Sequence, residues 1–263
     1  HGRLLDENLD RMAGLFFELG KAYFLSGNDS KMRIYLHKKA ISIERARAEG
    51  RRLVKETSEL AERAAPSREA RSSLKRANDL LRGKRKLKDP KPARTALDNA
   101  RRFLEECLIL KSDHSAARLF LAGYFLRVDR VDEAIEEYHK LLGRTDVSKH
   151  HRALALQALG NAHGIRREYE KSVECYEEIF RSDLAGDDPR FFHVPLGLAM
   201  FLAKLGRFDK AVEAFGRVVE NYPDKIGDAR AILSRAEVFR GLLAERQAFR
   251  SELVTRYPML FAS

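Results

Sequence analysis

The stretch Leu205-Gly-Arg-Phe-Asp-Lys-Ala-Val-Glu-Ala-Phe-Gly-Arg-Val-Val-Glu-Asn-Tyr-Pro223 has the pattern of a turn, an amphipathic helix and a stop. Gly206 interrupts the preceding helix, and Asp209 is placed to accept hydrogen bonds from the free amides of the next one. Pro223 ends the helix, because proline has no amide hydrogen to donate. Spacings of four and three put the following apolar residues on one helical face: Ala211, Phe215 and Val218.

The same unit occurs twice more upstream. Ser172 and Ala134 occupy the position equivalent to Ala211. Ser172 lies 39 residues before Ala211, and Ala134 lies 38 residues before Ser172. A partner helix precedes each unit, with a small residue or glycine after a leucine: Leu198-Ala199-x-x-Leu202, Leu159-Gly160-x-x-His163 and Leu121-Ala122-x-x-Phe125. This pattern resembles the tetratricopeptide repeat family, whose unit of about 34 residues is slightly shorter. The resemblance covers roughly residues 115–225.

The resemblance implies an all-α, right-handed α-solenoid of helix-turn-helix repeats, each of which contacts only its neighbours. We expect two parts. Residues 1–112 form an irregular, basic helical section, and residues 113–263 form the repeat array. The expected repeats are about 115–148, 153–186 and 192–225, followed by a degenerate capping repeat at 227–260.

The N-terminal section departs from a regular repeat. Residues 3–26 carry the first-helix pattern Leu19-Gly20-x-x-Tyr23, and the 3-4 spacing of small and apolar residues predicts one long helix over 31–64. A helix over 67–82 should pack antiparallel to it, because the link is short. Residues 93–110 then look like the second helix of a repeat whose first helix is 67–82. The long helix is either part of an irregular repeat or a protruding hairpin that recruits a partner or dimerises.

Charge is unevenly distributed along the chain. Residues 31–94 hold 21 Lys and Arg against 8 Asp and Glu, a net charge of +13, so the remainder carries a net −2. The most basic loop lies at 83–92, and its cations are Lys84, Arg85, Lys86, Lys88 and Lys91. Like charges and two prolines keep such a loop extended, so it either contacts phosphate groups of nucleic acid or anionic lipid or is merely solvated. It contains no aromatic residue for base stacking.

The sequence contains none of the motifs that mark common catalytic sites, such as GxSxG, HExxH, a P-loop or GxGxxG. Cys107 and Cys175 have no metal-ligand spacing, and we interpret them as small buried hydrophobes. His150 and His151 point about 100° apart on a helix and have no third ligand. We therefore expect that the protein is not an enzyme and that it has no metal site, no cofactor and no small-molecule substrate.

The sequence supports a protein-binding function better than it supports catalysis. In the tetratricopeptide family the first helix of each repeat lines a concave groove, and the resemblance implies the following groove residues: Leu119, Leu126, Arg127, Gln157, Asn161, Ile165, His193, Leu196, Met200, Lys204 and Arg235. Such a wall, apolar with scattered hydrogen-bonding and basic groups, suits a peptide or amphipathic helix from a partner protein. The alternative is that some of these residues pack against neighbouring helices and the groove is unused.

The sequence thus predicts a non-enzymatic adaptor that holds a protein segment in its groove. The alternative is electrostatic docking of residues 31–94 on nucleic acid or an anionic membrane surface. No apolar run approaches the ~20 residues of a membrane span. A cytoplasmic location is slightly favoured. The alternative is membrane tethering or export, because the sequence begins at His1 and a targeting segment or tag could have been removed upstream. Partner identity and oligomeric state are not determined by the sequence.

Overall fold

The structure is a computed structural model, and it describes residues 2–26, 45–61, 68–81, 96–184, 188–235, 241, 243–244 and 246–261. Within these residues every regular element is a helix, which confirms the predicted all-α fold of helical repeats. The chain divides into two compact units, 1–137 and 138–263, with the division inside α6 (Val131–Leu142). The predicted boundary between residues 112 and 113 separates an irregular section from regular repeats, which is a different criterion from compactness, so it stays a prediction. Among the described helices, none combines the length and apolar character that crossing a bilayer requires.

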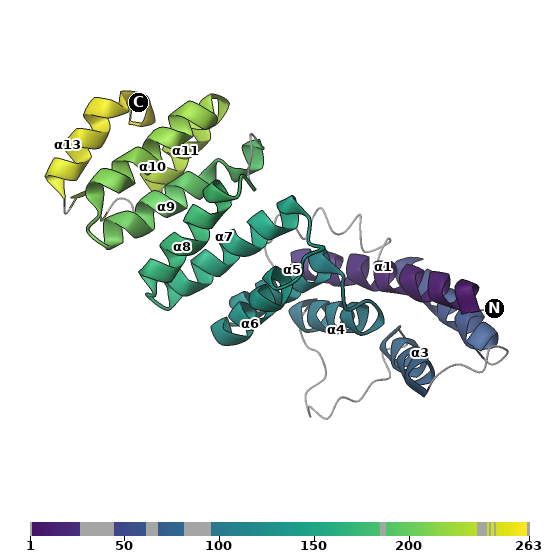
Figure 1. The fold of residues 1–263 in the computed structure, drawn as a ribbon. Helices are drawn as coiled ribbons and strands as arrows, with labels where there is room; N and C mark the ends of the chain where they lie inside the picture. Colours follow the sequence, from purple (N-terminus) through teal and green to yellow (C-terminus); the bar gives the residue numbers. More distant parts are fainter. Residues whose placement is uncertain are drawn as a thin grey trace. The chain divides into compact units, whose positions relative to one another are not determined.

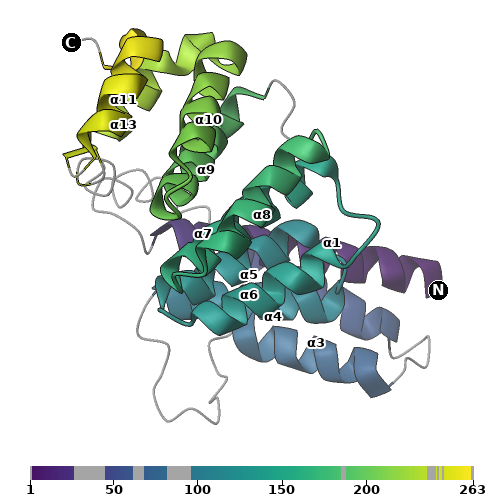
Figure 2. The ribbon, with the colours of Figure 1, turned by 60° about the vertical axis from the view of Figure 1, so that its left-hand side comes forward.

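The first unit is built around α1 (Gly2–Ser26) and α4 (Ala96–Leu110), which pack against each other (Figures 1 and 2). Gly20 permits the close approach, because a Cβ at this position would lie 2.7 Å from Cγ of Leu104. Phe16 and Phe103 are fully buried in this contact, with ring centroids 5.8 Å apart. Helix α5 (Ser115–Arg127) packs on both α1 and α4.

The main partner of α4 is therefore α1, and the expectation that 67–82 would supply it is wrong. The α1/α4 contact repeats the one made by two sequential helices of the second unit, α7 (Lys149–Ile165) and α8 (Tyr169–Arg181). There a Cβ at Gly160 would lie 2.8 Å from the ring of Tyr176. In both pairs the glycine follows a leucine. In both pairs the residue that contacts the glycine, Leu104 or Tyr176, lies four positions after a small residue on the second helix, Ala100 or Ser172. Helices α1 and α4 are thus the two halves of one repeat, separated by residues 27–95.

Part of this intervening segment packs on the α1/α4 pair. The helical residues 45–61 approach α1 at Gly50, where a Cβ would lie 2.9 Å from Leu15 and 3.0 Å from Leu81. Leu81 ends α3 (Arg68–Leu81), so the expected contact between these two helices is present in their described parts. Helix α3 also contacts α4, where Arg76 lies 3.4 Å from the buried carboxylate of Glu106. Residues 45–61 therefore pack on the repeat rather than standing free of it, whereas residues 31–44 lie outside the described residues.

The second unit continues in chain order, and successive helices lie beside one another (Figure 1). After α7 and α8 come a short 3-10 turn at Pro189–Phe191, α9 (His193–Lys204) and α10 (Phe208–Asn221). The last elements are Pro223–Lys225, α11 (Ile226–Arg235), α13 (Gln247–Arg256) and Pro258–Leu260. One continuous core runs through these helices, and its largest fully buried side chains are Ile179, Phe191, Phe215, Leu253 and Leu260.

The turns inside the repeats have the same geometry. Asp129, Arg167 and Gly206 have φ values of 60°, 61° and 73°, and they stand 38 and 39 residues apart, at the period of the sequence repeat. The amide after each of them donates to a carbonyl five residues earlier, at 2.8 to 2.9 Å: Arg130 to Phe125, Glu168 to His163, and Arg207 to Leu202. This is the hydrogen-bond pattern of a Schellman motif, which ends a helix with one residue in the left-handed region.

The predicted capping role of Asp209 is wrong. Helix α10 begins at Phe208 and its N-cap is Arg207, which makes no side-chain capping bond, so Asp209 lies inside the first turn. A carboxylate in that position still interacts favourably with the positive end of the helix dipole. The predicted stop is confirmed, because α10 ends at Asn221, directly before Tyr222 and Pro223.

Candidate functional site

Two stripes of residues on α7 and α9 form the candidate site, which we call the α7/α9 surface. Gln157, Asn161 and Ile165 recur every four residues along α7. His193, Met200 and Lys204 lie on α9, together with Gly197. The two stripes approach each other at the hydroxyl of Tyr176 on α8, which bonds to Asn161 and lies where a Cβ at Gly197 would point.

Tyr176 fixes the orientation of Asn161. Its hydroxyl donates a hydrogen bond of 2.8 Å to Oδ1 of Asn161, while its ring is buried. A Cβ at Gly197 would lie 2.8 Å from the Tyr176 ring and from its hydroxyl, so the absence of a side chain at position 197 gives the phenol its room. Oδ1 of Asn161 accepts this bond, and Nδ2 of the exposed amide carries two donor hydrogens.

The far end of the α7/α9 surface is apolar with one cation. Ile165 is 58% exposed and presents an aliphatic side chain to solvent. Lys204 is exposed at the end of α9, with Nζ 5.4 Å from the ring centroid of Tyr169. Tyr169 in turn stacks on Phe201, at 6.2 Å between ring centroids. The ammonium of Lys204 is thus held over an aromatic face.

The remaining predicted residues of this unit have different environments. Gln157, His193 and Met200 are half-buried, and burial lowers the pKa of His193, so its imidazole is neutral at pH 7. Leu196 is only 2% exposed and belongs to the core, so we leave it out of the α7/α9 surface. Arg235 is the last residue of α11, and its side chain lies outside the described residues.

In the first unit, Leu119 and Leu126 are half-buried on α5. Arg127 is engaged within the unit. Its Nη1 donates at 2.8 Å to the carbonyl oxygen of Phe24, and its guanidinium carbon lies 3.6 Å from the centroid of the Phe24 ring. Arg127 therefore fastens α5 to the end of α1, which is a structural task that the repeat pattern did not reveal.

The cations proposed for phosphate contact, Lys84, Arg85, Lys86, Lys88 and Lys91, lie outside the described residues. In the described part of the basic section, a hollow is lined by Arg51, Arg52 and Lys55. Two of these cations already have partners, because Arg52 lies 2.6 Å from Glu49 and Lys55 lies 4.0 Å from Glu59. The local charge is thus partly compensated.

Reactive or metal-binding side chains do not gather in the part of the chain that the structure describes. It contains no group of three His, Cys, Asp or Glu placed to hold a metal ion. Burial raises the pKa of the Cys107 thiol to about 12 and that of Cys175 to about 11, so both are protonated at neutral pH. The rings of His150 and His151 are 5.8 Å apart, and Nδ1 of His150 lies 3.9 Å from Asp188.

The tetratricopeptide repeat family model matches residues 196–225, which include most of α9 and all of α10. Among solved structures, crystal structures of MamA are 18% identical. One covers 63% of this chain and 87% of its own with a TM-score of 0.47, and another, MamA AMB-1, covers 73% and 90% with a TM-score of 0.44. YrrB, described as a TPR protein with an unusual peptide-binding site, is 16% identical, covers 63% and 81%, and has a TM-score of 0.40. No curated protein sequence matches.

Residues 196–225 match the family directly, and the two preceding helix pairs share their period and turn geometry. Proteins built from such repeats are interaction scaffolds that present surfaces to other proteins. The matched segment, residues 196–225, is thus identified as a tetratricopeptide repeat.

Proposed function

We propose that the α7/α9 surface binds an extended segment of a partner protein. The observation that carries this proposal is the amide of Asn161, which is exposed on α7 while its oxygen is held by Tyr176. A side-chain amide that is fixed in this way loses little conformational freedom when it donates to a backbone carbonyl of a ligand. Ile165 offers an apolar contact beside it, and Lys204 offers a cation for an acidic side chain of the segment.

The structure decides which substitution tests this surface cleanly. Met200 is half-buried and packs against the core, so a charge there would also destabilise the fold. Asn161 and Ile165 are exposed, and the double variant Asn161→Ala/Ile165→Glu removes the amide and the apolar contact. It also leaves the buried hydroxyl of Tyr176 without its acceptor, at a cost of about 1–3 kcal/mol, so urea denaturation first checks that the variant is folded. Asn221→Ala/Val254→Glu is the matched control, because it makes the same chemical changes at exposed positions on α10 and α13.

The experiment is a selection of random peptides displayed on phage against the full chain, followed by affinity measurements with synthetic peptides. We expect peptides whose affinity falls at least about tenfold in Asn161→Ala/Ile165→Glu and is unchanged in the control, because a buried contact and a hydrogen bond are both lost. Peptides that bind both variants equally well would refute the assignment of this surface.

Electrostatic docking through residues 31–94 stays as the alternative prediction. Binding that neutralises about six to ten phosphates loses roughly 10³–10⁵ in affinity between 50 and 200 mM salt, whereas an apolar contact loses far less. Charge reversal of Lys84, Arg85, Lys86 and Lys88 therefore discriminates between the two. Binding of RNA or anionic vesicles that disappears in this variant and at high salt would support the alternative.

A further inference from the structure

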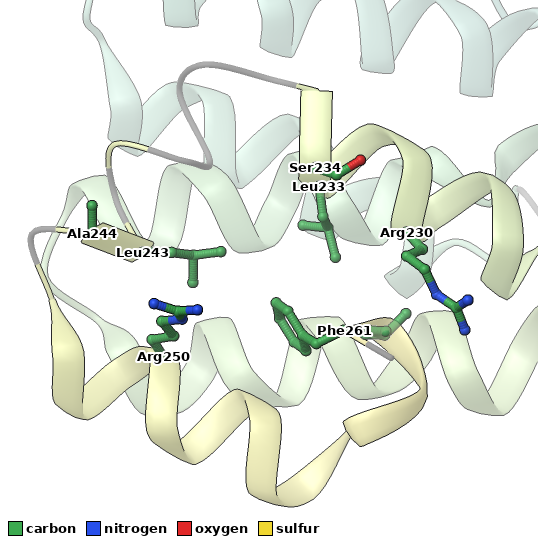
Figure 3. Close-up of a pocket in the computed structure, with 8 residues that line it drawn as sticks. Arg230, Leu233, Ser234, Leu243, Ala244, Arg250 and Phe261 are labelled. Atoms are coloured by element: carbon green, nitrogen blue, oxygen red, sulfur yellow. The ribbon is translucent and has the colours of Figure 1, made fainter. Parts of the chain in front are cut away.

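A cavity of about 340 Å³ lies between α11 and α13 (Figure 3). Its apolar wall consists of Leu233, Leu243, Leu260 and Phe261. Leu233 and Leu260 are 3% and 0% exposed, so they form a fixed floor that belongs to the core. A volume of this size is at the lower end of the range for small-molecule sites, which are mostly apolar with a few placed polar groups.

Among the described lining residues, Ser234 and two arginines supply the polar groups of this cavity. Nε and Nη2 of Arg230 donate to the carbonyl oxygen of Met259, at 3.2 and 2.7 Å, which holds Arg230 at the rim. Arg250 extends from α13 toward Leu243 (Figure 3). The eight described lining residues include no carboxylate, so the described part of the cavity combines an apolar floor with a positive rim.

We propose that this cavity binds an aliphatic carboxylate, with the carboxylate on Arg250 and the hydrocarbon tail against Leu233, Leu243 and Phe261. The planar guanidinium fork matches a carboxylate better than it matches a single-point acceptor. Burial of the tail supplies the apolar part of the binding free energy. This site is separate from the α7/α9 surface in sequence and in chemistry, and its failure would leave the proposed peptide binding untouched.

The probe is octanoate, titrated into the full chain and followed by the methyl resonances of assigned leucines. We expect saturable shifts at Leu233, Leu243 and Leu260. Octan-1-ol, which has nearly the same tail without the charge, should bind about tenfold more weakly, because it lacks the charge-assisted hydrogen bond. Acetyl-Gly-Leu with a free carboxylate forms a second arm, which separates a free acid from the C-terminal residue of a peptide as the source of the ligand.

Arg250→Gln should lower the affinity for octanoate about tenfold, to that of octanol, and should leave octanol binding unchanged. Arg256→Gln is the matched control. It changes an exposed arginine on the same helix, where Arg256 lies 3.2 Å from Glu252, and octanoate binding should not change. The proposal is overturned if octanol binds wild type as tightly as octanoate. Equal losses in the two arginine variants, or octanoate shifts away from these three leucines, would also overturn it.

Discussion

The hydroxyl of Tyr176 on α8 donates a 2.8 Å hydrogen bond to Oδ1 of Asn161 on α7, beneath the backbone of α9 at Gly197. Three consecutive helices thus meet around one polar contact. The bond holds an exposed amide in one orientation, which a free asparagine on a helix surface would not keep. Tyr176 is therefore a positioning residue for the proposed peptide contact rather than a contact itself.

Tyr176→Phe keeps the ring and removes only this bond. We expect the free energy of unfolding to fall by about 1 kcal/mol, because Oδ1 of Asn161 can bond to water instead. Peptide affinity should fall less than it does in Asn161→Ala, since the amide is still present but no longer oriented. Urea denaturation and the affinity of a selected peptide are the two measurements. A Tyr176→Phe variant that binds as tightly as wild type would show that orientation is unimportant.

The left-handed turn positions predict opposite effects at two equivalent sites. Arg167 has φ of 61° without being glycine, so Arg167→Gly should raise the free energy of unfolding by about 0.5–1 kcal/mol. Gly206→Ala should lower it by about 1 kcal/mol, because the new Cβ is strained at φ of 73°. Gly227→Ala is the control, since its Cβ would meet nothing within 4 Å, and it should be neutral or stabilising. The same sign at positions 167 and 206 would contradict this explanation.

The pairing of α1 with α4 can be tested at Gly20. Gly20→Val places side-chain atoms against Leu104, and we expect a loss of about 1–3 kcal/mol in the free energy of unfolding, the usual cost of overpacking. Gly14→Ala on the same helix meets nothing within 4 Å and should cost nothing. Chemical denaturation measures both. If α3 were the true partner of α4, Gly20→Val would behave like Gly14→Ala.

The pKa of Asp188 should be measurably low. Its side chain accepts hydrogen bonds from the guanidinium and the backbone amide of Arg190, and these hold the pKa of the carboxyl at about 2. A depressed carboxyl pKa stabilises the fold above the ordinary value near 4, and this contribution is lost as pH falls from about 4 toward 2. NMR titration of the Asp188 carboxyl carbon gives the midpoint directly. In Arg190→Ala it should move up toward the ordinary value, and a midpoint near 4 in wild type would exclude the interaction.

Both thiols should be slow to react in the folded protein. Because burial raises the pKa of Cys107 to about 12 and of Cys175 to about 11, the reactive thiolate is scarce at pH 8. We expect Ellman's reagent to titrate neither thiol quickly in the native state and both in guanidinium chloride. Cys175, which is half-buried, should react before the fully buried Cys107. Fast labelling of Cys107 in native protein would contradict its placement between α1 and α4.

The local repeat could be predicted from the sequence because it depends on short-range patterns. The 38- and 39-residue period, the helix ends near Gly206 and Pro223, and the small residues at helix crossings all follow from steric rules that act within one or two turns of chain. Asn161 and Ile165 could be assigned to the candidate surface for the same reason, since a four-residue spacing puts them on one stripe. The same rule also selected Leu196, which is core, because spacing does not distinguish the two sides of a helix that is buried on most of its surface.

Tertiary structure alone decided which helices pair and which polar groups are engaged. The sequence placed α4 next to its neighbour in the chain, whereas the structure pairs it with α1 across about 70 residues of intervening chain, where Gly20 and Leu104 fit together. The local pattern around Gly20 marks a first helix, but it does not specify which later helix is its partner. Likewise, Arg127 is engaged by Phe24, Asn161 is oriented by Tyr176, and a cavity forms where α11 and α13 meet. Local sequence thus determined the repeat unit, while long-range packing determined the pairing of helices and the chemistry that their surfaces offer.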